Sequence, residues 1–397
     1  MRLLGAGLGI LLKVGGRMSV IMLLPSLALS TVTGLNVYAS ILLMGVVTTV
    51  YAMEGGFEAV VWTDVMQVAV TIGGVLVALA CMARGVDGGL AGIVHAGMAA
   101  GKFHAISTAP TLAQPTVWVF CGMFLGHIFS VVGDQPLMQR MLATSDVRAA
   151  RRSIVMGNVI GGAGSVLFFF VGTSLWVFYQ AHPGRVPAEM STDAIFPFFI
   201  ANELPPGIVG LIIAGLFAAA MGALSSNMNA TAAIAVTDFQ GTLQAGATEA
   251  RRVRLARLTT LSAGIIATGI AAWLAWHGVA SLWDEYLNLV ALIGGGFPGV
   301  FGLGLLTRRA NAPGALIGAI VSIVVTWVVQ TYTSTSPFLQ VFVAVAACIG
   351  VGYVASLFCA ARVPRKNLAG LTLWDPPKSA ADRPSQPDSA GPEAPQL

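Results

Sequence analysis

About ten stretches of this sequence are apolar for close to 20 residues, the length of helix that crosses the hydrocarbon core of a bilayer. Inside that core every backbone N–H and C=O group needs a partner within the chain, so such stretches must be helical. The sequence therefore predicts an all-α polytopic membrane protein with about ten transmembrane helices. The predicted spans are Leu3–Leu29, Val37–Met53, Phe57–Ala83, Thr116–Val132, Ile154–Tyr179, Ile208–Val236, Leu258–Trp276, Leu287–Leu306, Ala315–Val328 and Phe338–Ala361.

The composition supports the same class. Only 10% of the 397 residues are charged and 56% are hydrophobic, whereas about 25% of residues are charged in soluble domains. The four cysteines all lie in apolar runs without paired spacing, so neither a disulfide framework nor a zinc site is indicated. Walker, dinucleotide-binding, HExxH and G-x-S-x-G motifs are absent from the sequence, so an enzyme or an ATP-driven pump is not indicated.

Two shorter apolar stretches do not have the length of a span. Gly88–Ala100 is rich in glycine and predicts an interfacial helix, and Ile195–Asn202 predicts a second surface element before the span that begins at Ile208. The residues from Asp375 to Leu397 include six prolines together with Ser, Asp and Gln, a composition typical of disorder. We therefore expect a transmembrane domain over residues 1–365 and a proline-rich tail over residues 366–397.

Arginine placement predicts the orientation. The net charge of +4 comes from a few loops, so it indicates membrane topology and not nucleic-acid binding. Basic residues gather in the loops after every second span, starting with the fourth span. These residues are Arg140, Arg148, Arg151, Arg152, Arg251, Arg252, Arg254, Arg257, Arg308, Arg309, Arg362, Arg365 and Lys366. The positive-inside rule places these loops and the C-terminus in the cytoplasm, as expected for a plasma membrane protein of the bacterial inner-membrane type.

The span around Phe217–Phe239 carries an unusual polar stripe. At helical pitch Gly222, Ser225, Ser226 and Asn229 fall on one face. One interpretation is helix packing, because small and hydroxyl residues let membrane helices approach closely. The other is a ligand or ion site, because polar groups at this depth face protein or a water-filled cavity.

Further polar residues lie at or inside other spans. Asp64 lies about two turns into the third span and is either an interfacial acid paired with arginine or a cation waypoint. His127 and Ser130 are three residues apart in the fourth span, where packing and ligand binding are both open. The Gly133–Asp134 pair is followed by no second, matched aspartate, so an aspartyl protease is not supported.

Three consecutive glycines, Gly294–Gly296, and Pro298 interrupt the span Leu287–Leu306 at mid-depth. Interrupted helices at the bilayer midplane are typical of transporter sites, because the freed backbone groups can coordinate ions or substrate. A simple glycine–proline kink is the alternative.

The sequence resembles the sodium:solute symporters over nearly its whole length, to about Arg365. Four motifs carry the resemblance in order and spacing: GGFEAVVWTDVMQ, GDQPLMQRMLATSDVRAARRS, AAAMGALSSNMNA and GGGFPGVFGLGLLTRR. The resemblance implies a five-plus-five inverted-repeat transporter fold. In it, Leu3–Leu29 corresponds to the third core helix, and the chain lacks about the first three spans. It also implies sodium-coupled symport of a small organic solute across the bilayer, with Na⁺ as coupling ion and without other cofactor or metal.

The resemblance also implies site residues. Cation-binding positions fall on Ala219, through its backbone carbonyl, and on Gly222 and Ala223, with Asp64 near the route by which Na⁺ leaves. Relatives carry two hydroxyl residues where Gly222 and Ala223 stand, so we expect Ser225 and Ser226 to substitute in part. Expected substrate-binding residues are His127, Ser130, Asn229 and Asn288.

These departures leave two other hypotheses open. The short N-terminus and the Gly222–Ala223 pair are also compatible with an inactive fragment, or with a membrane scaffold or sensor that does not transport. A third hypothesis keeps transport but makes it proton-coupled through His127 or Asp64, or uncoupled. The sequence does not identify the solute.

Overall fold

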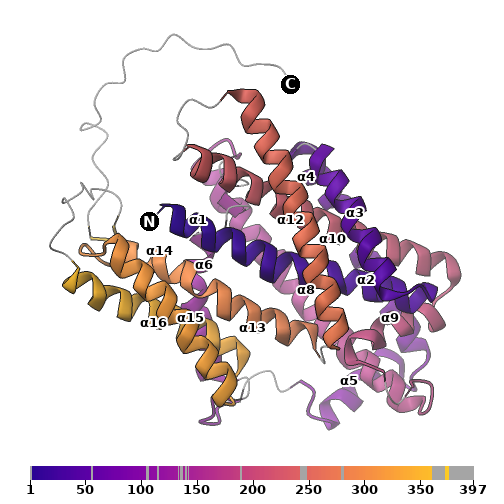
Figure 1. The fold of residues 1–397 in the computed structure, drawn as a ribbon. Coiled ribbons are helices and arrows are strands. Elements are labelled where there is room, and N and C mark those ends of the chain that lie inside the picture. Colours follow the sequence, from indigo (N-terminus) through magenta and orange to yellow (C-terminus); the bar gives the residue numbers. More distant parts are fainter. Residues whose placement is uncertain are drawn as a thin grey trace.

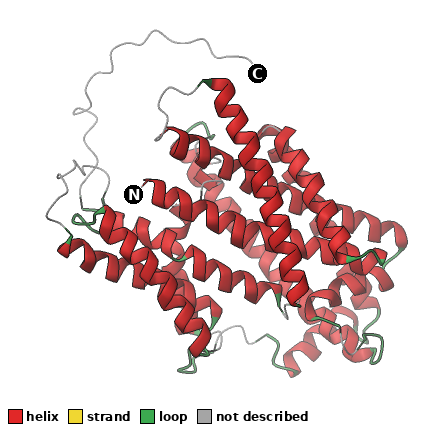
Figure 2. Ribbon diagram, viewed as in Figure 1, coloured by secondary structure: helices red, strands yellow, loops and turns green. Residues whose placement is uncertain are grey.

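The structure is a computed structural model. It describes residues 2–54, 57–103, 107–113, 116–132, 134, 137–138, 141, 143–187, 190–241, 248–278, 281–359 and 372–374. Within these ranges the regular elements are helices, with one isolated bridge between Ser107 and Thr116 (Figure 2). They are α1 (Arg2–Leu11), η1 (Leu12–Met18), α2 (Ser19–Thr33), α3 (Val37–Glu54), α4 (Phe57–Arg84), α5 (Gly89–Ala99), α6 (Val117–Val132), α8 (Val147–Ala181), α9 (Thr192–Glu203), α10 (Pro206–Ile234), η2 (Ala235–Gln240), α12 (Glu249–His277), α13 (Leu282–Gly294), α14 (Gly296–Leu306), α15 (Ala312–Tyr332) and α16 (Pro337–Phe358).

The predicted spans are helical. Among the described residues eight helices are long and apolar enough to cross a membrane, and the bent pair α13–α14 makes a ninth. The remaining predicted span, Thr116–Val132, is the 16-residue helix α6. The all-helical fold class is thereby confirmed, because a long apolar run has no other way to satisfy its backbone in lipid.

The two shorter stretches are also helices, α5 and α9. The interior of α9 is more buried than a surface element would be, because Phe199 is fully buried and stacks edge-on against Phe178 of α8 at a ring-centroid distance of 5.2 Å. α9 therefore belongs to a second apolar core, formed with α4, α5 and α8.

The main core lies where α2, α3, α10 and α12 pack together (Figure 1). One glycine on α3 and one on α12 let these two helices approach closely. A Cβ on Gly45 of α3 would overlap Thr268 of α12, and a Cβ on Gly264 of α12 would overlap Thr49 of α3. Without a hydrophobic driving force between helices in lipid, this close van der Waals contact is what holds such a pair together.

The last four helices form a separate layer. α15 and α16 run side by side, and α13 and α14 pack against them and against the first helix (Figure 1). The α15–α16 contact is again built on glycine, since a Cβ on Gly314 would overlap the Ser356 side chain. This layer places the interrupted span opposite α1 and η1.

Candidate functional site

A cavity of about 570 Å³ lies between the first helix and the interrupted span. Its walls come from α1–η1, the end of α10 with η2, α6, α13–α14 and α16. Apolar residues form most of the lining, as is usual for small-molecule sites. The polar residues of the lining are few: Lys13, Arg17, His127, Asp134, Asp238 and Tyr286.

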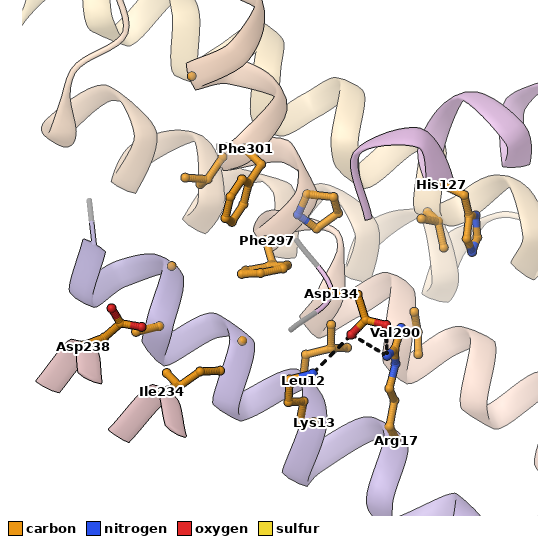
Figure 3. A pocket seen from close by; sticks show the side chains of 18 of the residues that line it. Leu12, Lys13, Arg17, His127, Asp134, Ile234, Asp238, Val290, Phe297 and Phe301 are labelled. Atoms are coloured by element: carbon orange, nitrogen blue, oxygen red, sulfur yellow. Dashed lines mark hydrogen bonds and ion pairs between the residues drawn. The ribbon is translucent and has the colours of Figure 1, made fainter. Parts of the chain in front are cut away.

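Two cations and one carboxylate meet at one side of this cavity (Figure 3). Lys13 Nζ lies 3.3 Å from Asp134 Oδ1, and Arg17 Nη1 lies 3.4 Å from the same oxygen and 3.5 Å from Oδ2. Lys13 is 5% exposed. Figure 3 shows Asp238 well away from this cluster, on the opposite side of Ile234. Among the residues that the structure describes, the Lys13–Arg17–Asp134 cluster therefore carries an excess of one positive charge, which makes it attractive to an anion.

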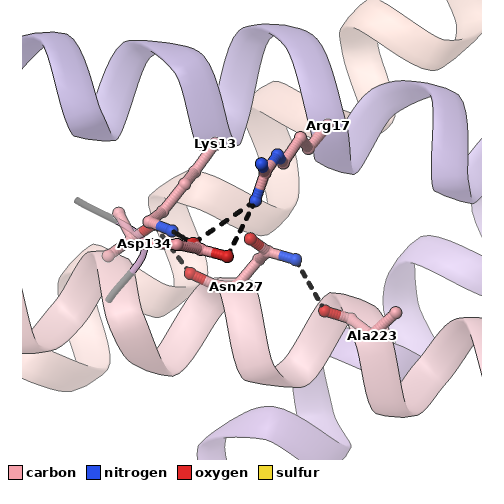
Figure 4. A network of polar contacts seen from close by, with 6 residues as sticks. Lys13, Arg17, Asp134, Ala223 and Asn227 are labelled. Carbon is pink, nitrogen blue, oxygen red and sulfur yellow. Dashed lines mark hydrogen bonds and ion pairs between the residues drawn. The ribbon is translucent and has the colours of Figure 1, made fainter. Parts of the chain in front are cut away.

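Asn227 of α10 lies beside this charged cluster (Figure 4). Its Nδ2 donates to the Ala223 carbonyl at 2.9 Å, and its backbone carbonyl accepts from Thr231 Oγ1 at 2.8 Å. Its Oδ1 is buried without a hydrogen-bond partner among the described residues, and so is Nε of Arg17. Such unmatched buried groups are costly, and a water or a bound molecule that both donates and accepts would satisfy the pair.

The helical geometry of η1 puts the two cations on one face. Lys13 and Arg17 are four residues apart, and the segment Leu12–Met18 that carries them is π-helical and contains Gly15 and Gly16. Single π-helical turns occur frequently at functional sites, since the extra residue re-aims the side chains. Buried ionisable groups in a span point by default to function.

The interrupted span forms the facing wall. α13 and α14 meet at Gly295 with a bend of 46°, and Val290, Phe297 and Phe301 of this pair line the cavity. A Cβ on Gly295 would overlap Ala344 of α16, so the break also allows close packing on its outer side. The predicted interruption is therefore both a bend and part of a cavity wall.

The polar stripe of α10 does not line this cavity. Ser225 is fully buried and donates to the Gly222 carbonyl at 3.0 Å. The side chains of Ser226 and Asn229 are half-buried and make no hydrogen bond to other described residues. Ala219 and Ala223 are half-buried on the same helix. The stripe thus keeps hydroxyl and amide oxygens among packed helices, which leaves both packing and cation binding compatible with it.

The other predicted site residues divide into three groups. His127 lines the cavity, and its Nδ1 lies 3.0 Å from the Met123 carbonyl. Asn288 is half-buried on α13 and its carbonyl accepts from Gln330 Nε2 of α15 at 2.9 Å, without lining the cavity. The side chains of Asp64 and Ser130 lie outside the part of the structure that is described.

Sequence reasoning missed four residues of this site: Lys13, Arg17, Asp134 and Asn227. Lys13 and Arg17 were visible as charges that interrupt an apolar run, and a charge inside a span is itself a signal of function. Their partner, Asp134, is more than 110 residues away in sequence. Asn227 sits within the motif but off the i, i+3, i+4, i+7 stripe, so the periodicity gave no reason to select it.

A multi-pass helical membrane protein with an interrupted span against a partly charged cavity has the architecture of a secondary transporter. The sequence profile of the sodium:solute symporter family matches residues 1–322, so the chain belongs to this family.

Proteins similar in sequence to this chain include sodium-coupled transporters. The sodium/sialic acid symporter SiaT of Proteus mirabilis is 32% identical over 78% of this chain and 63% of its own length. NanT of Aliivibrio fischeri, also a sodium/sialic acid symporter, is 29% identical over 90% of this chain and 71% of its length. The human sodium-coupled monocarboxylate transporter 1 is 28% identical over 74% of this chain.

A solved structure of a Na⁺-coupled sialic acid symporter, in a substrate-bound outward-open state, superimposes with a TM-score of 0.78. The two sequences are 27% identical, and the match covers 92% of this chain and 75% of the other. The chain spans 63% of the length of the Proteus mirabilis relative and 48% of the human one. The shared fold and the family are therefore established over the part of those proteins that this chain covers.

Proposed function

We propose that this protein carries out Na⁺-coupled symport of a small organic acid across the bacterial inner membrane. The observation that carries this proposal is that Lys13 and Arg17 both reach the cavity and share one carboxylate, Asp134. A substrate carboxylate would neutralise the remaining positive charge. Arginine and lysine bind carboxylates through charge-assisted hydrogen bonds, which are about twice as strong as neutral ones.

The relatives support this substrate class. Their names describe symporters for sialic acid and transporters for monocarboxylates, which are organic acids. The cavity of about 570 Å³ has room for a molecule of that size. The aromatic rings of Phe297 and Phe301 on the facing wall would contact the apolar part of the solute (Figure 3).

The cation side of the proposal rests on α10. Ser225 and Ser226, together with the backbone carbonyls of Ala219, Gly222 and Ala223, would supply oxygen ligands for Na⁺, and Asp64 would lie near the route by which Na⁺ leaves. Inward movement of Na⁺ would then drive uptake of the solute, since the membrane potential supplies about 2.3 kcal/mol per charge per 100 mV. Because Gly222 and Ala223 offer no hydroxyl, proton-coupled or uncoupled transport is the second candidate mechanism.

Uptake into proteoliposomes tests the proposal. We expect an inward Na⁺ gradient to stimulate uptake of radiolabelled sialic acid or a monocarboxylate over a choline gradient, with little uptake of uncharged glucose. Arg17→Gln should reduce uptake of the acid by about tenfold, because one charged hydrogen bond is lost. Flux that responds equally to Na⁺, H⁺ and choline gradients would reject sodium coupling, and absence of any flux would favour a scaffold or sensor.

A separate substitution tests the cation site. The double variant Gly222→Ser with Ala223→Thr adds two hydroxyl ligands, so we expect the Na⁺ concentration for half-maximal uptake to fall. The matched control is Gly269→Ser, because Gly269 is an exposed glycine of α12 with no atom within 4 Å of an added Cβ. An unchanged Na⁺ response in the double variant would count against placing Na⁺ on this part of α10.

A further inference from the structure

A second recess, of about 620 Å³, lies at the end of α14 and is separate from the cavity described above. Thr307, Arg308 and Arg309 form its polar end, while Leu306, Ile349 and Gly350 form its apolar end. Tyr353 of α16 and Trp374 complete the lining. The recess is therefore amphipathic along its length.

The polar end is held in place by the segment Thr372–Trp374. Leu373 N donates to the Leu305 carbonyl at 3.1 Å, and Trp374 Nε1 donates to the Leu306 carbonyl at 2.7 Å. These bonds satisfy two of the carbonyls that the end of a helix leaves unpaired. Arg308 Nη2 in turn donates to the Trp374 carbonyl at 2.7 Å. This hydrogen bond holds the Arg308 side chain against Trp374 at the rim of the recess.

Arg309 differs from its neighbour. Its side chain is exposed, and it makes no ion pair or hydrogen bond with another described residue. An arginine next to an ordered Arg–Trp pair, at the end of a membrane helix, presents several N–H donors toward the headgroup region. Tryptophan and tyrosine concentrate at this same depth in membrane proteins.

The apolar end lies further along α16, toward the middle of this predicted span. Ile349 and Gly350 lie eight to nine residues before the end of α16 at Phe358, which corresponds to about 12–14 Å along the helix. Around Gly350 no atom lies within 4 Å of the position that a Cβ would take. The helix surface is therefore open at Gly350, at a depth where acyl chains and not headgroups are found.

We propose that this recess binds an anionic phospholipid. The phosphate contacts Arg309 and Arg308, and one acyl chain runs past Leu306 along the open surface at Gly350. Basic pockets beside membrane helices recognise anionic headgroups through such contacts. The site does not depend on the transport proposal, because its ligand and its residues are different. Since α14 also lines the central cavity through Phe297 and Phe301, the bound lipid would steady the half-helix that forms that wall.

Lipid retention measured by native mass spectrometry tests this site. The protein is purified in detergent and given equal amounts of phosphatidylglycerol and phosphatidylcholine. We expect the wild type to retain phosphatidylglycerol preferentially, and Arg309→Gln to weaken that retention about fivefold, from the loss of one charge near the surface. Arg251→Gln is the matched control, because Arg251 is an exposed arginine of α12 that does not line the recess.

The acyl-chain contact has its own test. The Cβ that Gly350→Leu adds at this exposed position meets no atom within 4 Å, so the protein should fold, while retention of phosphatidylglycerol should fall to the level of phosphatidylcholine. Gly157→Leu, at an equally open glycine of α8, should leave retention unchanged. Equal retention by Arg309→Gln and Arg251→Gln would overturn the proposal. So would competition by inorganic phosphate as effective as competition by the lipid, which would make this a site for soluble anions.

Discussion

At the scale of single residues, the decisive feature is a lysine buried inside a membrane span. Lys13 is 5% exposed and is bonded to Asp134, which also contacts Arg17. Moving such a charge out of water costs several kcal/mol unless its partner stays in place. Each charge of the cluster is therefore stabilised by the others, and substitutions of its members should be tested in combination.

Lys13→Met should destabilise the protein, because it leaves Asp134 with Arg17 as its remaining partner among the described residues. Breaking a fully buried pair costs about 3–5 kcal/mol, and we expect about 1–3 kcal/mol here because Asp134 is 26% exposed. Adding Asp134→Asn should recover part of that loss. Thermal unfolding of the wild type, both single variants and the double variant measures the coupling. Additive losses would show that the two residues do not interact.

At the scale of elements, the bend between α13 and α14 depends on the packing of α16 against Gly295. Gly295 has ordinary helical backbone angles, so it is not required for conformational freedom. A Cβ at this position would overlap the Ala344 side chain of α16. The glycine is therefore explained by close approach of α16, and a side chain there would push the interrupted span away from its support.

Gly295→Ala should consequently lower the melting temperature, with a cost of about 1–3 kcal/mol typical of overpacking. The second substitution Ala344→Gly removes the methyl group that is hit, so the double variant should recover part of the stability. Gly304→Ala serves as control, because that glycine of α14 has no atom within 4 Å of its added Cβ. A melting temperature in Gly295→Ala equal to that of Gly304→Ala would contradict the packing described.

At the scale of the whole molecule, the alternation of basic and neutral loops predicts one orientation in the membrane. The start of α12 carries Arg251, Arg252, Arg254 and Arg257. The loop between α15 and α16 carries no basic residue. Three spans separate the two places, since α13 and α14 together count as one. They must therefore lie on opposite sides of the bilayer.

Labelling of single cysteines checks this orientation. In a variant with all four native cysteines replaced, a cysteine at Arg251 should react with an impermeant maleimide only after the cells are opened. A cysteine at Ser334, which is exposed between α15 and α16, should react in intact cells. Labelling at both positions from outside, or the reverse pattern, would refute a cytoplasmic location for the arginine-rich loops and for the C-terminus.

The sequence by itself determined the spans and the interruption at Gly294–Gly296. An apolar run in lipid has only the helix available to satisfy its backbone, and three glycines beside Pro298 weaken a helix in any surroundings. The family motifs were likewise visible in the linear order of residues. These features are local, so no knowledge of packing was needed to find them.

Only the tertiary structure decided which polar residues meet. Asp134 lies 121 residues from Lys13, and its pairing depends on where Asp134, beyond the end of α6, lies relative to η1. The predicted stripe of α10 does not line the cavity, while its neighbour Asn227 lies beside the charged cluster (Figure 4). Contacts of this kind arise from the way in which whole helices pack, and the apolar pattern of each helix alone does not specify its neighbours.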